Sequence, residues 1–188
     1  YGVYHGPEGL TKIAIRIHSL TALLQRALKR AGFKVSELAF FDTLVVSFSK
    51  EEQQKVLKRS QEAKINFRLF DNGAIGISLD ETTEEIHLKQ ILKALGAPEI
   101  LPSLDETTSL ISGDLRRKKP FLTHSVFHKY HSETEMLRYI RRLESKDLSL
   151  TSSMIPLGSC TMKLNASSEM YPVGWQEFSA IHPFSPPA

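Results

Sequence analysis

The feature that most constrains the fold is a long stretch of helical periodicity near the start of the chain, over residues 7–31. Pro7 suits the first turn of a helix, where no backbone N–H is needed, and Gly32 is typical of a helix C-terminus. The apolar side chains recur at the spacing of one helix face: Ile13, Ile17, Leu20, Leu24 and Leu28. Burying such a stripe requires other elements packed against it, so the sequence predicts a layered fold.

Two strands and a second helix are predicted next. Residues 33–37 form a short strand-like run, and residues 44–48 alternate between two faces. The alternating apolar side chains are Leu44, Val46 and Phe48. Ser49 and Glu52 have the spacing of a capping box, in which each side chain bonds the other residue's backbone N–H. This box predicts a helix that ends near Ala63.

A β-hairpin follows this helix. Its strands are predicted from apolar residues at every second position: Phe67 and Leu69, then Ile75, Ile77 and Leu79. Asn72 and Gly73 lie between the strands, and Asn-Gly readily takes the positive φ angles of a type I′ turn. The sequence therefore predicts a tight two-residue hairpin turn.

A second capping box, Thr82 with Glu85, predicts a third helix that ends near Leu95. The resulting order is helix, two strands, helix, two strands and helix. This order predicts an α+β domain, in which helices cover one face of an antiparallel sheet. The expected core contains Ile13, Ile17, Leu20, Leu24, Val46, Phe48, Phe67, Leu69, Ile75 and Ile77.

The regular pattern ends after residue 96, which sets the expected domain limits. We assign residues 1–96 to the α+β domain and residues 97–120 to a linker, because prolines and glycine replace the periodicity there. Residues 121–188 are expected to form a helix and an extended arm that leads into a domain absent from this chain.

A third capping box, Ser132 with Glu135, predicts the helix of this last segment. Its apolar stripe is Met136, Leu137, Ile140 and Leu143, and its solvent side carries Arg138, Arg141 and Arg142. Regular signals fade from Asp147 onward, and four prolines lie after residue 170. We therefore expect residues 150–188 to be extended, and poorly ordered unless they pack on another chain or domain.

Composition excludes several classes of protein. Among 188 residues, 41% are hydrophobic and the net charge is +3, as in an ordinary water-soluble domain. The single cysteine excludes an internal disulfide framework, no apolar run approaches the ~20 residues of a membrane span, and no signal peptide opens the chain. The longest basic run, residues 116–119, is too short to indicate nucleic-acid binding. Because the first residue is Tyr1, we expect the chain to be part of a longer protein.

Three histidines and a glutamate suggest a metal site at first sight. His124, His128 and His131 lie close to Glu133 in the sequence, and two histidines on one helix face are common zinc ligands. The predicted helix starts only after Ser132, however, so these histidines do not share it with Glu133. Half-buried, hydrogen-bonded histidines are the favoured interpretation, and no metal is expected.

A polar loop over residues 153–165 gathers a glycine, hydroxyl side chains, the only cysteine and a lysine. Such loops commonly carry binding groups. Cys160 would need a lowered pKa to act as a nucleophile, and only Lys163 lies close by in the sequence, so a pocket-lining or structural thiol is favoured. Lys163 itself has the chemistry to line a cavity, contact an anion or form a Schiff base with a cofactor.

This loop resembles the LGSCTMK signature of the P-protein family of the glycine cleavage system, the pyridoxal-phosphate-dependent glycine decarboxylases. Departures from the family pattern occur at His128, Gly174 and Gln176. Further segments resemble the family in the same order along the chain: residues 4–10, 41–44, 66–68, 76–82, 120–124, 130–135 and 181–184.

The resemblance implies a function for the whole enzyme. The cofactor, pyridoxal 5'-phosphate, acts as an electron sink while glycine loses its carboxylate as carbon dioxide. The aminomethyl group then passes to the lipoyl group of the H protein. The family's Schiff-base lysine lies in a Gly-rich His-Lys motif that this chain lacks, so no catalytic residue is assigned. The expected pocket-lining residues are Ser159, Cys160, Thr161 and Lys163.

The family also implies where this chain belongs in the enzyme. Residues 1–96 resemble the small C-terminal domain of fold type I pyridoxal-phosphate enzymes, and the chain joins the two halves of the protein. We expect the fragment alone to be inactive and not to bind the cofactor stably. The full-length enzyme is expected to be a homodimer that binds neither nucleic acid nor membranes, cytoplasmic in a bacterium and mitochondrial in a eukaryote.

Two other functions are compatible with parts of the sequence. Residues 1–95 also resemble two-layer α+β modules that bind small ligands or regulate other proteins, but such a module leaves residues 150–188 unexplained. A nucleic-acid-binding module would need basic residues clustered with exposed aromatics. Most of the Phe and Tyr residues here occupy core-like positions, so this third function is the least favoured.

Overall fold

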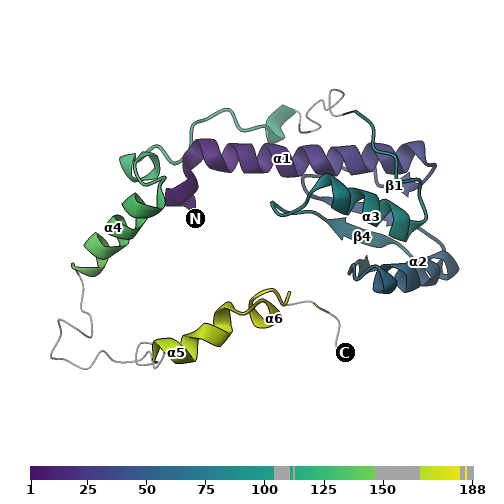
Figure 1. The fold of residues 1–188 in the computed structure, drawn as a ribbon. Coiled ribbons are helices and arrows are strands. Elements are labelled where there is room, and N and C mark those ends of the chain that lie inside the picture. Colours follow the sequence, from purple (N-terminus) through teal and green to yellow (C-terminus); the bar gives the residue numbers. More distant parts are fainter. Residues whose placement is uncertain (104–110, 112, 147–165, 183–184, 186–188) are drawn as a thin grey trace. The chain divides into compact units, whose positions relative to one another are not determined.

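The computed structural model describes residues 1–103, 111, 113–146, 166–182 and 185. It divides into unit 1, residues 1–4 and 124–188, and unit 2, residues 5–123 (Figure 1). Unit 2 contains α1 (Gly2–Arg30, which begins in unit 1), β1 (Lys34–Val35), β2 (Thr43–Ser47), α2 (Lys50–Glu62), β3 (Arg68–Leu69), β4 (Ile75–Ser78), α3 (Glu85–Leu95) and the 3₁₀ helix η2 (Gly113–Leu115). Unit 1 contains η3 (Ser125–His128), α4 (Glu133–Glu144), α5 (Ser167–Met170), η5 (Tyr171–Gly174) and α6 (Gln176–Ser179).

Unit 2 is built on a four-stranded antiparallel sheet with strand order β1-β2-β4-β3. Leu44 and Val46 of β2 pair with Ile77 and Ile75 of β4, so these four side chains share one face. All four belong to the core cluster, together with apolar residues of α1, α2 and α3. The predicted α+β architecture, with helices against one sheet face, is therefore confirmed.

The first helix has the predicted course. Gly6 has φ 62° and ψ −178°, which interrupts the helix, and Pro7 opens the longer part. Gly32 has φ 85°, its N–H bonds Lys29 O at 3.0 Å, and Phe33 N–H bonds Leu28 O at 3.0 Å. This pair of bonds is the Schellman motif, in which a glycine takes the left-handed conformation that ends the helix. Both predicted ends of α1 are confirmed.

The capping box before α2 is also confirmed. Glu52 N–H donates to Ser49 Oγ at 3.2 Å, and Ser49 N–H donates to Glu52 Oε2 at 2.9 Å. These two bonds satisfy backbone donors that have no partner within the helix. The helix itself runs from Lys50 to Glu62, one residue short of the predicted end.

The predicted two-residue hairpin turn is wrong. Phe70 N–H bonds Ala74 O at 3.0 Å, so three residues form the loop, and Gly73 N–H bonds Phe70 O at 3.0 Å. Only Gly73, at φ 90°, has a positive φ there, whereas a type I′ turn requires two such residues. Three-residue loops of this kind combine an ordinary turn with a glycine in the left-handed region. The loop has three residues because the strand register pairs Leu69 with Ile75, so that Phe70 and Ala74 close the loop around residues 71–73.

The predicted capping box at the start of α3, Thr82 with Glu85, is wrong. Thr82 does not cap the helix, because its N–H and hydroxyl donate to Asp80 Oδ1 at 2.9 and 2.7 Å. The cap residue is Glu84, whose N–H donates to His87 Nδ1 at 3.0 Å. An aspartate two residues before a threonine favours this local turn over a helix cap. The end at Leu95 is as predicted.

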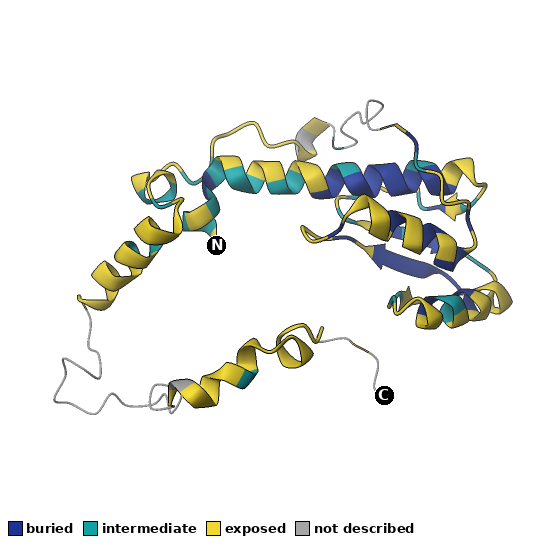
Figure 2. Cartoon of the chain, viewed as in Figure 1, coloured by how far each residue is buried: buried dark blue, intermediate teal, exposed yellow. Residues whose placement is uncertain are grey.

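The predicted core residues fall into three groups by burial. Figure 2 shows how burial is distributed along the chain. Six are buried: Ile17, Leu20, Leu24, Val46, Ile75 and Ile77. Ile13, Phe48 and Phe67 are half-buried. Leu69 is 40% exposed, so its predicted burial is wrong. It lies on β3, one of the two edge strands of the sheet, which has a neighbouring strand on one side only.

In unit 1, Ser132 caps α4 as predicted, since its Oγ accepts from Glu135 N–H at 3.3 Å. The segment around residues 167–179 forms short helices, α5, η5 and α6, where an extended arm was predicted. Proline at the second position of η5 suits a helical turn as well as an extended chain. Within the described residues, no helix has the length and apolar character needed to cross a bilayer.

Candidate functional site

The loop predicted to line a pocket lies outside the described residues. All four of its candidate residues, Ser159, Cys160, Thr161 and Lys163, fall within residues 147–165, so the structure gives them no position. Their role stays a prediction.

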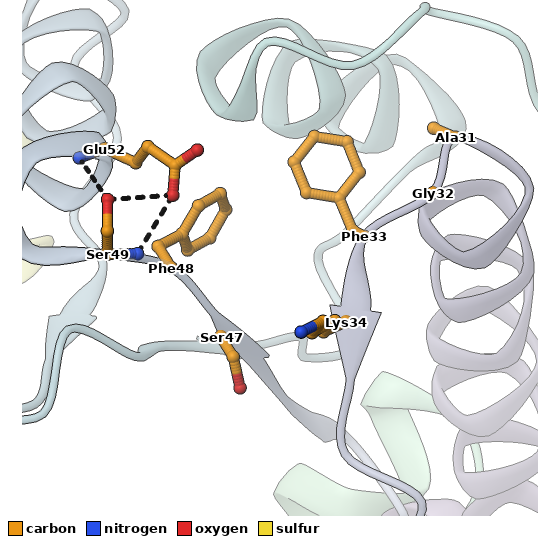
Figure 3. A pocket seen from close by; sticks show the side chains of 8 residues that line it. All are labelled: Ala31, Gly32, Phe33, Lys34, Ser47, Phe48, Ser49 and Glu52. Carbon is orange, nitrogen blue, oxygen red and sulfur yellow. Dashed lines mark hydrogen bonds between the residues drawn. The ribbon is translucent and has the colours of Figure 1, made fainter.

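One hollow of unit 2 has a volume of about 500 Å³ and lies where α1 ends and α2 begins (Figure 3). The rings of Phe33 and Phe48 meet edge to face there, with centroids 5.7 Å apart. Ser49 and Glu52 form its polar wall through the capping box of α2. The complete lining is Ala31, Gly32, Phe33, Lys34, Ser47, Phe48, Ser49 and Glu52.

The carboxylate in this hollow is committed to the helix cap. The backbone N–H of Ser49, and then its hydroxyl, lower the pKa of Glu52 by stabilising the charged form. The anion therefore occupies the N-terminus of α2, where the helix dipole favours negative charge. This arrangement stabilises the start of α2.

A second hollow, of about 490 Å³, lies beside α3 and the segment that follows it. Leu23 of α1 forms part of its wall, with Glu85 and Lys89 of α3 and Glu99 beyond the helix. The remaining lining residues are Ile100, Leu101, Pro102 and Ser103. Two carboxylates around one lysine disfavour binding of a phosphate-bearing molecule.

Neither hollow fits pyridoxal phosphate. A phosphate dianion needs several converging N–H or cationic donors, but the lining of the first hollow includes one cationic side chain, Lys34, and the carboxylate of Glu52. The lining of the second includes one cationic side chain, Lys89, and two glutamates. Neither of these two hollows therefore offers a cradle for the phosphate group.

The histidines near η3 serve local structure. His124 caps η3, because its Nδ1 accepts from Val126 N–H at 3.2 Å. His131 Nδ1 lies 2.7 Å from Tyr4 O, within unit 1. His128 ends η3, whereas Glu133 begins the separate helix α4. All three histidines are exposed, where half-buried ones were predicted. In the parts of the chain that the structure describes, no three potential metal ligands come together.

Several segments of the family resemblance meet in the sheet of unit 2. Thr43 Oγ1 and Ser78 Oγ lie 2.8 Å apart across β2 and β4, and Arg68 pairs with Gly76 across β3 and β4. A Cβ at Gly76 would lie 3.2 Å from the Phe70 ring. These segments, residues 41–44, 66–68 and 76–82, therefore have a structural role here.

Three polar anchors were not found by sequence reasoning. Gln53 of α2 donates from Nε2 to Phe70 O at 3.0 Å and to Ala74 O at 2.9 Å, so it holds the hairpin loop. Arg59 of α2 donates to Ala94 O at 2.8 Å and Leu95 O at 3.1 Å, at the C-terminus of α3. His18 is buried with its Nδ1 3.0 Å from Phe41 O. The only sequence signal for these three anchors was a polar side chain at a helix position where the pattern predicts an apolar one.

The turn at Asp80 makes stability depend on pH. The hydroxyl of Thr82 is the largest cause that lowers the pKa of Asp80, whereas partial burial raises it. A lowered pKa means that this stabilisation is complete above the unfolded-state pKa of about 3.9 and is lost as pH falls through the folded-state pKa. In urea titrations between pH 2 and 6, the advantage of the parent over Asp80→Asn should therefore shrink below pH ~4. An advantage that grows as pH falls would contradict this assignment.

Known proteins resemble this chain over nearly all of its length. A family model described as "Glycine cleavage system P-protein" matches residues 1–95. The chain is 49% identical to glycine dehydrogenase (decarboxylating) of Nostoc sp., covering 99% of this chain and 20% of that protein. It is 48% identical to the mitochondrial protein of that name from Mus musculus, covering 99% of this chain and 18% of the relative. For the Homo sapiens mitochondrial protein, identity is 49% over 99% of this chain and 19% of the relative.

These relatives are much longer than the chain, which spans about a fifth of their length. The identity nevertheless extends through both structural units, because the aligned region covers 99% of the chain. The chain belongs to the glycine cleavage system P-protein family.

Proposed function

We propose that this chain is part of a pyridoxal-phosphate-dependent glycine decarboxylase. The enzyme decarboxylates glycine and transfers the remaining aminomethyl group to the lipoyl group of the H protein. The observation that carries the proposal is identity of about half the residues with proteins named glycine dehydrogenase (decarboxylating), over 99% of the chain. A free-standing ligand-binding module is disfavoured because the similarity continues beyond unit 2 into residues 124–188.

Within the enzyme, residues 1–96 form a small domain of the fold type I class, residues 97–120 a linker and residues 121–188 an arm that leads into a large cofactor domain. The antiparallel sheet with helices on one face supports the first assignment. The separation of the described residues into two compact units supports a chain that joins two parts of a larger protein.

The cofactor belongs to another part of the enzyme. Both hollows of unit 2 carry carboxylates, which repel a phosphate group. The loop with Ser159, Cys160, Thr161 and Lys163 forms one wall of the substrate pocket, where Lys163 supplies a positive charge rather than the covalent link to the cofactor. The isolated chain is accordingly inactive.

The partners follow from the same assignment. Glycine and the lipoylated H protein bind the full-length enzyme, which acts as a homodimer. Relatives occur in a cyanobacterium and, with the word mitochondrial in their names, in animals. The protein is therefore cytoplasmic if its source is a bacterium and mitochondrial if its source is a eukaryote.

The test is release of labelled carbon dioxide from glycine by the full-length protein with lipoylated H protein. Lys163→Met should lower kcat/KM for glycine about tenfold or more, because a charge that faces substrate is lost. Lys58→Met, at an exposed position of α2, is the matched control and should leave the rate unchanged. Absence of turnover in the parent would refute the proposed function, and an unchanged rate in Lys163→Met would remove Lys163 from the pocket.

A further inference from the structure

The hairpin loop between β3 and β4 contains a chemically reactive pair of residues. Asn72 is the only asparagine in the sequence that precedes a glycine. The side-chain amide of an asparagine can react with the backbone nitrogen of the next residue, and glycine hinders this approach least because it has no Cβ. Asn72 is exposed, whereas Gly73 is buried. The sequence therefore supplies the reactive pair, and the conformation of the loop decides how fast it reacts.

The reaction is deamidation through a cyclic imide. The Gly73 nitrogen loses its proton to water or hydroxide and bonds to Asn72 Cγ, and Asn72 Nδ2 leaves as ammonia. Water then opens the ring on one side of the imide nitrogen. If the bond to Cγ breaks, the product is aspartate; if the bond to the main-chain carbonyl carbon of residue 72 breaks, the product is isoaspartate. Water is the only co-reactant.

The folded loop withholds the nucleophile of this reaction. The N–H of the buried Gly73 donates to Phe70 O at 3.0 Å. Asn72 Oδ1 accepts from Ala74 N–H at 3.1 Å, so the side chain is held as well. The bond to Phe70 O must break before the Gly73 nitrogen can lose its proton to water. The reaction therefore proceeds from an opened loop, and the population of that opened state sets its rate.

Gln53 of α2 holds the loop closed. Its Nε2 donates to Phe70 O at 3.0 Å and to Ala74 O at 2.9 Å. The same Phe70 O accepts from Gly73 N–H, and the same Ala74 O accepts from Phe70 N–H. Gln53 is 7% exposed, so a separation of loop and helix would leave buried polar groups without partners, which is costly. We propose that Asn72 is a deamidation site and that Gln53 keeps its reaction slow in the folded domain.

The two products differ in how they fit the loop. Aspartate keeps the side-chain oxygen that accepts from Ala74 N–H. Isoaspartate instead adds a methylene to the main chain just before Gly73. There is little room for this addition, because even a Cβ on Gly73 would lie 2.5 Å from Phe48 O. Isoaspartate at residue 72 therefore disrupts the contact between the hairpin loop and the start of α2.

Peptide mapping during incubation at neutral pH tests the site and its protection. In a synthetic peptide of residues 65–79, Asn72 should convert faster than Asn66, which precedes the bulky Phe67. In the 188-residue chain, Asn72 should convert ~100-fold more slowly than in the peptide. Equal rates in the chain and the peptide would overturn the protection. A peptide in which Asn72 converts no faster than Asn66 would overturn the site.

Hydrogen exchange of the Gly73 amide gives a second measurement that needs no variant. The same opening exposes this amide to exchange and to deamidation, so the amide should exchange far more slowly in the 188-residue chain than in the peptide. Exchange of Gly73 as fast as in the peptide would overturn the closed loop as the cause of protection.

A matched pair of substitutions on α2 tests the role of Gln53. In the 188-residue chain, Gln53→Met should speed deamidation of Asn72 about tenfold, because both bonds to the loop are lost. Gln54→Met, at the neighbouring exposed position, should leave the rate unchanged. An unchanged rate in Gln53→Met would overturn the role of Gln53.

Val56→Ala separates opening of the loop from unfolding of the whole domain. Val56 lies on the same helix and belongs to the core cluster. For equal losses in the urea midpoint, Val56→Ala should speed deamidation of Asn72 less than Gln53→Met does. Equal acceleration would mean that Asn72 reacts only in the globally unfolded chain, and would overturn the role of Gln53.

Discussion

Replacing Leu24 with alanine should lower the free energy of unfolding of unit 2 by about 2–5 kcal/mol. The Leu24 side chain is fully buried, and it belongs to the cluster in which α1 meets the sheet and α3. The substitution removes apolar contacts and leaves a cavity that the close-packed neighbours only partly fill. Urea titration followed by circular dichroism gives the change directly.

The matched control is the same substitution at Leu38, which is 79% exposed. Leu38→Ala should change the free energy of unfolding by less than about 0.5 kcal/mol. If the two variants lose equal stability, or if Leu24→Ala falls within error of the parent, the assignment of this face of α1 to the core is wrong.

Gly73→Val should destabilise unit 2 by about 2–5 kcal/mol, through two separate causes. Gly73 has φ 90°, which a β-branched residue adopts only under strain. A Cβ there would also lie 2.5 Å from Phe48 O, closer than real Cβ contacts come. Backbone must therefore move at the start of α2 as well as in the hairpin loop.

Gly32→Val separates these causes, because Gly32 has a similar φ of 85° but its Cβ would meet nothing within 4 Å. Thermal unfolding of both variants should show the larger loss for Gly73→Val, by the energy of the close contact. Equal losses would mean that only backbone strain matters at Gly73, and would contradict the contact with Phe48.

The sequence predicted best where a local rule and burial agree. The spacing of Leu20, Leu24 and Leu28 predicted the buried face of α1, and Gly32 predicted its end, because only glycine adopts that conformation cheaply. The capping box of Ser49 and Glu52 was right because both of its hydrogen bonds are local: they join the residue before α2 to a residue of its first turn.

The errors arise where a neighbour in space decides the structure. The register of Leu69 with Ile75 produced a three-residue loop, although Asn-Gly by itself favours a two-residue turn. The edge position of β3 exposed Leu69. Asp80 took the hydroxyl of Thr82 that was expected to cap α3. None of these outcomes is visible from the local pattern alone.

Sequence patterns say little about the candidate site for a different reason. The hollows of unit 2 are formed by residues far apart in the chain, such as Leu23 with Ile100. The loop that carries Lys163 was singled out by composition and by resemblance to the family, and it lies outside the described residues. The family assignment is confirmed by the comparisons, whereas the role of each residue in this loop stays a prediction.

The proposed function requires that this chain is one part of a glycine decarboxylase and that the lysine that binds the cofactor lies outside it. Borohydride reduction in the presence of pyridoxal phosphate, followed by peptide mapping, tests it most directly, because reduction fixes the cofactor on any lysine it has joined. In the 188-residue chain, we expect weak labelling spread over many lysines, with no carbon dioxide released from glycine in the presence of lipoylated H protein. In the full-length protein, we expect one equivalent of label on a lysine outside residues 1–188, with turnover. Stoichiometric labelling of Lys163 together with turnover by the 188-residue chain would contradict the account.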